Sequence, residues 1–163
     1  MRRVRARLIA IDGVPGVGKS TLAETMAKRL KTRPVQLDRF LSRRRDGYVR
    51  YINRYRLERS LRGLRTAVVE GVCVLKVLRS VGREPDALIY IKRFSSGRWA
   101  DEQDFVPTGS LDGHLAAIQA EADAWSGALG GHFNRSLKEE VIRYHVEFNP
   151  HHEATHVYVR ADT

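Results

Sequence analysis

Two patterns of hydrophobic and polar positions alternate along the chain. Short runs dominated by apolar and β-branched residues are typical of buried parallel strands, and they occur at residues 7–11, 34–37, 66–69, 87–91 and 156–159. Apolar residues at helical spacing predict helices at residues 21–31, 47–64, 72–79, 115–129 and 137–148. Strands that alternate with helices indicate an α/β fold, with a parallel sheet of about five strands and helices on both faces.

One stretch departs from this alternation. Residues 94–113 are rich in glycine, serine and acidic side chains, and they have little apolar periodicity. Such a composition favours a mobile, lid-like loop. Because 163 residues suffice for one hydrophobic core and are few for two domains, we expect residues 1–163 to form a single domain that carries this lid.

Composition narrows the class of protein further. The chain is 42% hydrophobic and 29% charged, as expected of a folded protein. Its single cysteine, Cys73, permits no disulfide framework, so we expect a reducing, cytoplasmic location. No apolar run approaches the roughly 20 residues that span a bilayer, and we therefore expect no membrane association.

The strongest chemical signal is the sequence GVPGVGKS at residues 13–20. It matches the phosphate-binding pattern GxxxxGK[ST], and it lies between a predicted strand and a predicted helix, as that motif requires. Glycines let backbone N–H groups turn toward a phosphate, and the N-terminus of the helix adds positive potential. The motif predicts a P-loop NTPase fold that binds a nucleoside triphosphate, with ATP and Mg²⁺ as the expected cofactors.

The motif also assigns roles to its residues. Lys19 is expected to reach the β- and γ-phosphates as a catalytic group, and the hydroxyl of Ser20 to bind Mg²⁺. The predicted nucleotide-binding residues are Gly13, Val14, Pro15, Gly16, Val17, Gly18, Lys19, Ser20 and Thr21.

Two carboxylates follow predicted strands, and the carboxyl ends of parallel strands carry the sites of such folds. Asp38 follows the second strand, where a carboxylate can accept the proton of an attacking hydroxyl; the alternative is an N-cap of the next helix. Glu70 ends the third strand, a place for a carboxylate that holds Mg²⁺; the alternative is a buried acid paired with an arginine. We expect the metal at Ser20, Glu70 and Asp38.

Three segments together resemble the uridine kinase group of P-loop nucleoside kinases. They read GVPGVGKSTLA at residues 13–23, QLDRF at residues 36–40 and VVEGV at residues 68–72. The resemblance implies that Asp38 is the base that receives the proton of the acceptor hydroxyl. Members of this family also carry paired arginines in a lid after the fourth strand. The corresponding region here has no such pair but contains Arg93 and Arg98, which we expect to stabilise charge on the transferred phosphoryl group.

The net charge of +10 favours anionic partners. The primary interpretation is a kinase that transfers the γ-phosphate of ATP to a hydroxyl of a small molecule, most readily a nucleoside or related metabolite. The alternative is a polynucleotide 5′-hydroxyl kinase or another kinase that acts on RNA or DNA, and a solvated arginine-rich surface is the simpler explanation of the charge. A GTPase switch is disfavoured, because the sequence has no NKxD motif.

Overall fold

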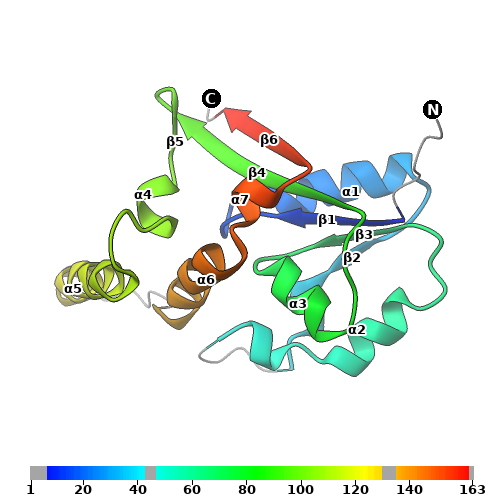
Figure 1. The fold of residues 1–163 in the computed structure, drawn as a ribbon, viewed down its shortest axis with the longest axis horizontal. Coiled ribbons are helices and arrows are strands. Elements are labelled where there is room, and N and C mark those ends of the chain that lie inside the picture. Colours follow the sequence, from blue (N-terminus) through cyan, green and yellow to red (C-terminus); the bar gives the residue numbers. More distant parts are fainter. Residues whose placement is uncertain (1–6, 43–46, 130–134, 162–163) are drawn as a thin grey trace.

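The computed structural model describes residues 7–42, 47–129 and 135–161. They form an α/β fold around one mostly parallel sheet (Figure 1). The strands are β1 Leu8–Asp12, β2 Pro34–Gln36, β3 Ala67–Glu70, β4 Ala87–Ser95, β5 Arg98–Trp99 and β6 His156–Ala161. Parallel pairing gives the order β2-β3-β1-β4-β6, and β5 adds to β4 as an antiparallel hairpin. The expected sheet of about five parallel strands is confirmed.

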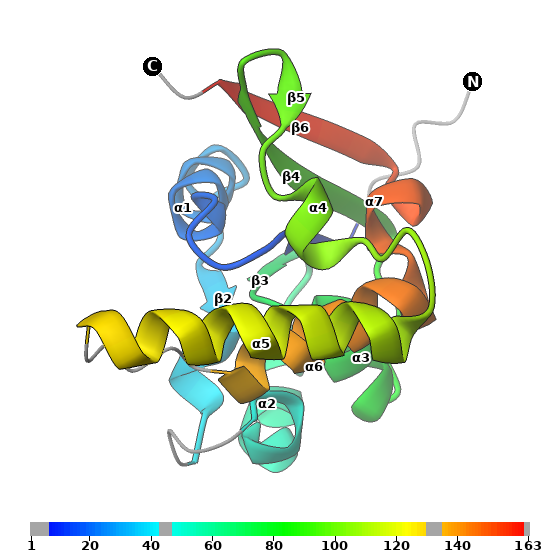
Figure 2. The ribbon, with the colours of Figure 1, turned by 90° about the vertical axis from the view of Figure 1, so that its left-hand side faces the viewer.

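Helices cover both faces of this sheet. They are α1 Lys19–Arg29, α2 Arg54–Leu61, α3 Val74–Ser80, α4 Glu102–Phe105, α5 Leu111–Leu129, α6 Arg135–Phe148 and α7 Pro150–Glu153, with 3₁₀ turns η1 Leu37–Phe40 and η2 Val49–Tyr51. The end-on view places α1 on one face and α3 and α6 on the other (Figure 2), which confirms the two-sided arrangement. Within the described ranges, no helix is both long and apolar enough to cross a membrane.

The central strands position the site. β1 lies between β3 and β4, and Ala10 and Ile11 have no exposed surface, which explains why the strand is continuously apolar. Its last residue, Asp12, is the first charged group along it. All five parallel strands end at the same edge of the sheet, and α5 crosses in front of this edge (Figure 2). The loops that follow β1, β2 and β3 therefore meet there.

The segment after β2 differs from its prediction. The sequence predicts one helix over residues 47–64, but the structure has the short turn η2 and then α2. Asn53 separates them: its backbone is extended, and its side chain accepts a hydrogen bond from the backbone N–H of Arg56. An asparagine in this position caps a new helix, so apolar spacing alone merged two elements into one.

The structure also corrects the expectation of a loosely structured loop at residues 94–113. This segment contains the end of β4, all of β5, all of α4 and the start of α5. Trp99, Asp101 and Phe105 are buried within it. Aromatic anchors without periodic spacing hold the hairpin against the domain, a type of packing that a search for periodicity does not detect. Whether the segment closes over a ligand stays a prediction.

Candidate active site

The glycine loop, residues 13–20, connects β1 to α1. Gly16 and Gly18 have φ values of 83° and 94°, in the left-handed region that favours glycine over other residues. Gly18 is also closely packed, because a Cβ atom there would lie 2.8 Å from Nη1 of Arg160. The left-handed backbone therefore favours glycine at position 18, whereas the contact with Arg160 is weaker evidence because the end of that flexible side chain can move.

Lys19 is the first residue of α1, and its side chain folds back over the loop. Its Nζ donates hydrogen bonds to the carbonyl oxygens of Gly13, at 2.9 Å, and Val14, at 2.7 Å. The side chain is buried, and burial lowers the pKa of Lys19, while the nearby carboxylates Asp12 and Glu70 oppose that change. These bonds hold an amine at the mouth of the loop, where a phosphate oxygen can replace the carbonyl partners.

Ser20 and Glu70 bring two oxygen atoms together beside the loop. Glu70 ends β3, in register with Ile11 of β1, and its Oε1 accepts a hydrogen bond of 2.9 Å from the Ser20 hydroxyl. Burial raises the pKa of Glu70. Magnesium usually takes one or two protein ligands and completes its shell with water and phosphate. Ser20 and Glu70 together offer two such ligands.

Asp38 lies in η1, on the opposite side of the same cavity. Its Oδ1 accepts a hydrogen bond of 2.6 Å from the hydroxyl of Tyr48. Burial, reinforced by the neighbouring Asp38, raises the pKa of Tyr48 well above its usual value, so the phenol stays protonated and donates. Both oxygens of Glu140, on α6, accept backbone N–H groups, those of Tyr48 and Val49, at 2.6 and 3.0 Å. Helix α6 thus holds the segment that orients Asp38.

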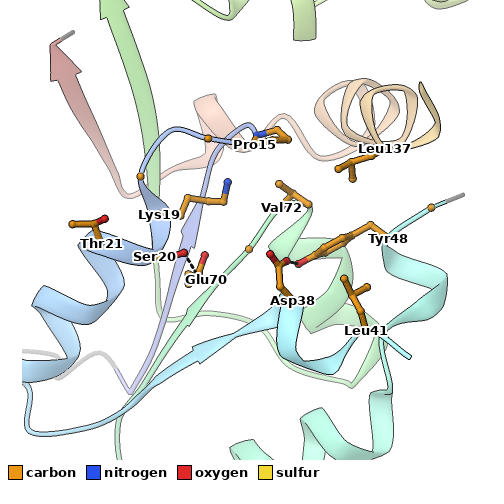
Figure 3. Close-up of a pocket in the computed structure, with 14 residues that line it drawn as sticks. Pro15, Lys19, Ser20, Thr21, Asp38, Leu41, Tyr48, Glu70, Val72 and Leu137 are labelled. Atoms are coloured by element: carbon orange, nitrogen blue, oxygen red, sulfur yellow. Dashed lines mark hydrogen bonds between the residues drawn. The ribbon is translucent and has the colours of Figure 1, made fainter. Parts of the chain in front are cut away.

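A cavity of about 630 Å³ joins these groups. Figure 3 shows Lys19, Ser20 and Glu70 on one side and Asp38 with Tyr48 on the other. The lining consists of Pro15, Gly16, Gly18, Lys19, Ser20, Thr21, Asp38, Leu41, Gly47, Tyr48, Glu70, Gly71, Val72 and Leu137. A cavity of this size is within the range of small-ligand sites. It offers polar groups on the side of the glycine loop, and Leu41, Val72 and Leu137 as apolar walls.

The structure separates the predicted site residues into two groups. Those of the glycine loop, Asp38 and Glu70 meet around one cavity, with Gly13, Val14 and Val17 as part of the loop itself. Arg93 and Arg98 do not line that cavity. Arg93 instead donates to the carboxylate of Asp101 at 2.7 Å, and Arg98 lies on the β5 hairpin.

Several residues at the site had not been predicted. Tyr48 and Leu137 line the cavity from segments far apart in the sequence. Arg160, on β6, donates to the backbone carbonyl of Val17 at 3.3 Å and lies against the glycine loop. The predicted last strand ended at residue 159, so a strand one or two residues longer would have brought Arg160 to the correct edge of the sheet.

Asp12 links the loop to α6. Its Oδ1 accepts the backbone N–H of Gly13 at 2.7 Å, and its Oδ2 accepts the hydroxyl of Tyr144. The carboxylate is 1% exposed, and burial raises the pKa of Asp12 to about 6. The signal in the sequence was a charged residue that ends an otherwise apolar strand directly before the motif.

Comparison with known proteins gives little further information. No family model matches the chain, and no curated protein matches it. Among solved structures, shikimate kinase from Bacteroides thetaiotaomicron is similar with a TM-score of 0.42 and 15% identity, over 95% of this chain and 86% of that one. An uncharacterized protein from Eubacterium ventriosum is similar with a TM-score of 0.46 and 12% identity, over 96% of this chain and 90% of that one. These similarities are too distant to assign an activity to this chain.

Proposed function

We propose that this protein is a P-loop kinase that transfers the γ-phosphate of ATP to a hydroxyl group of a small molecule. One observation carries the proposal: a single cavity has a glycine loop with its lysine on one side and an oriented carboxylate, Asp38, on the other. Phosphoryl transfer depends mostly on positioning and electrostatics, and these are the elements that such a reaction needs.

The glycine loop suits the triphosphate of the donor. Gly16 and Gly18 have the left-handed backbone that a phosphate-cradling loop needs, and Lys19 holds its amine against that loop. Magnesium fits between the hydroxyl of Ser20 and the carboxylate of Glu70. Asp38, the third expected ligand, is assigned to the acceptor instead, because it lies on the opposite side of the cavity (Figure 3). When bound, the metal would neutralise charge that develops between the β- and γ-phosphates.

Asp38 suits the acceptor hydroxyl. Tyr48 fixes its Oδ1. Among the described residues Oδ2 has no hydrogen-bond partner, and Asp38 is exposed, so this oxygen can accept the hydroxyl proton. As that proton transfers, the acceptor oxygen forms its bond to the γ-phosphorus, and the bond from this phosphorus to the β–γ bridging oxygen breaks to release ADP. The apolar walls at Leu41, Val72 and Leu137 favour an acceptor with a flat or apolar part, such as a nucleoside.

A screen for acceptors tests the proposal. We expect ADP release with ATP and Mg²⁺ to rise above the background hydrolysis for at least one member of a panel of nucleosides, sugars and amino alcohols, and Asp38→Asn to abolish the increase. Arg39→Gln is the matched control, because Arg39 is the exposed neighbour of Asp38 and does not line the cavity. Oligonucleotides with a 5′-hydroxyl belong in the same panel, since acceptor activity with them alone would favour the polynucleotide kinase. No acceptor-dependent ADP release with any compound would refute the proposal.

We also propose that Arg93 and Arg98 approach the phosphates when the donor binds. This requires the β4–β5 hairpin to move, because Arg93 is paired with Asp101. Hydrogen exchange of residues 94–113, with and without a non-hydrolysable ATP analogue and Mg²⁺, measures such a closure. Equal protection in both states would exclude it and would leave the two arginines without a catalytic role.

A further inference from the structure

The exposed face of α2 has an unusual composition. Residues 47–66 contain six arginines, no lysine and a single acidic residue, Glu58. In α2, Leu57 and Leu61 are buried against the domain. The exposed residues of the helix and its C-cap include the arginine face, which we define as Arg54, Tyr55, Arg56, Arg59 and Arg62. Each of these five residues is exposed to solvent.

Among the described residues, few negative charges lie against the arginine face. Arg62 pairs with Glu58 at 3.1 Å, and the guanidinium of Arg56 lies 5.9 Å from the centre of the Phe40 ring. Within the described residues, Arg54 and Arg59 form no ion pair. The face therefore presents a concentrated positive charge on one short, rigid element, and guanidinium groups bind phosphate oxygens in a bidentate manner.

Tyr55 adds an aromatic ring to this charge. Its side chain is 71% exposed, the highest value among the large apolar or aromatic side chains in the described part of the chain. A single exposed tyrosine is ordinary, but Arg59 and Arg62 follow this one at i+4 and i+7, so they lie on the same surface of the helix. Proteins that bind single-stranded nucleic acids combine cations that contact the backbone with aromatic rings on which unpaired bases stack.

We infer that the arginine face of α2 binds single-stranded nucleic acid, with the arginines on phosphates and Tyr55 stacked on a base. A duplex buries its bases and would leave Tyr55 without a partner, so the ring favours a single strand. α2 packs against η1, the turn that carries Asp38, so the bound strand would lie one element away from the candidate active site. The inference does not depend on the proposed kinase activity, because the binding needs no nucleotide donor.

Fluorescence anisotropy with a labelled single-stranded oligonucleotide tests the charge component. If four arginines contact phosphates, the logarithm of the affinity should fall against the logarithm of salt concentration with a slope of about −3, at roughly −0.7 per contact. Arg54→Gln/Arg59→Gln should reduce that slope by about 1.4. The matched control is Lys28→Gln/Arg29→Gln, which removes the same charge from exposed positions on α1, a helix that lies apart from α2 in both views (Figures 1 and 2).

Tyr55 variants test the stacking component. Tyr55→Ala should weaken binding about 5- to 150-fold, whereas Tyr55→Phe should keep most of the affinity because it retains the ring. Circular dichroism checks that each variant is folded, and acceptor-dependent ADP release should be unchanged in all of them, which separates this inference from the kinase proposal.

Four results would overturn the inference: no binding by the wild-type protein at low salt, equal losses in the two double variants, equal affinity of Tyr55→Ala and wild type, or preferential binding to phosphatidylserine vesicles over the oligonucleotide.

Discussion

The two sides of the cavity are built in different ways. The donor side comes from one contiguous segment, the glycine loop, with Glu70 on the adjacent strand. The acceptor side combines Asp38 and Leu41 with Tyr48, and with Leu137 from α6. A contiguous segment specifies its geometry through local backbone preferences, whereas the acceptor side depends on packing between distant elements. We therefore expect the donor side to be more robust and the acceptor side to determine which molecule reacts.

The largest effect should come from the acceptor side. Asp38→Asn retains the shape of the residue but removes the group that receives a proton, so the turnover number should fall by about 10²–10⁴. Affinity for ATP, measured by calorimetry, should change little, because the donor side is intact. A large loss of ATP affinity in this variant would show that the two sides are not independent.

Tyr48→Phe sharpens the same test. It removes the hydrogen bond of 2.6 Å to Asp38 but leaves the carboxylate in place. Its loss of turnover should be smaller than that of Asp38→Asn, because the variant affects only the orientation of the base.

The next largest loss of activity should come from a substitution on the donor side. Lys19→Ala removes the cation held by the glycine loop, and the rate of phosphoryl transfer should fall by about 10²–10³. Lys28→Ala, on the exposed side of the same helix, is the control and should retain the wild-type rate. Turnover by Lys19→Ala at the wild-type level would remove the glycine loop from the mechanism.

The contact between the glycine loop and α6 should affect how the free energy of unfolding depends on pH. Asp12 joins the start of the glycine loop to Tyr144 of α6, and burial raises its pKa from 3.8 to about 6. Between these values the folded state binds more protons than the unfolded state, so this group lowers the free energy of unfolding as the pH rises from about 4 to 6. Above about pH 6, the raised pKa of Asp12 makes the free energy of unfolding about 3 kcal/mol lower than it is below about pH 4.

The Asp12→Asn variant should lack this pH-dependent change in the free energy of unfolding. Urea unfolding of both proteins between pH 4 and 7 measures it, and the difference in unfolding free energy should move in favour of the variant as the pH rises. His145, whose pKa burial lowers to about 4, has the opposite pH dependence, but it is present in both proteins and cancels in the difference. Parallel curves would mean that Asp12 is not a destabilised carboxylate.

The smallest expected effect is on the concentration of Mg²⁺ that the reaction requires. Glu70→Gln keeps a partner for Ser20 but removes a negative charge, so the Mg²⁺ concentration for half-maximal rate should rise about 10-fold. Glu84→Gln is the control, since Glu84 is an exposed glutamate that does not line the cavity. An unchanged Mg²⁺ requirement would contradict the assignment of Glu70 to the metal.

Much of the fold could be predicted from the sequence. The apolar run before the glycine loop predicted β1, and the run that ends at Glu70 predicted β3. These predictions succeeded because a strand buried on both faces must be continuously apolar. Two features were missed: the polar cap at Asn53 divided one predicted helix, and the buried aromatic side chain of Trp99 ordered a segment predicted to be a loop.

The candidate site likewise has a part that could be predicted from the sequence and a part that could not. The order of residues in the glycine loop determines its own geometry, because glycine alone readily adopts the left-handed backbone at positions 16 and 18. The proximity of Asp38 to that loop also followed from the sequence, since the carboxyl ends of the parallel strands of one sheet lie at the same edge. What only the tertiary structure decided is which side chains outside the motif complete the site: Tyr48 on Asp38 and Arg160 on the loop. Their positions depend on how α6 and β6 pack against the sheet, and such long-range packing has no periodic signature in the sequence.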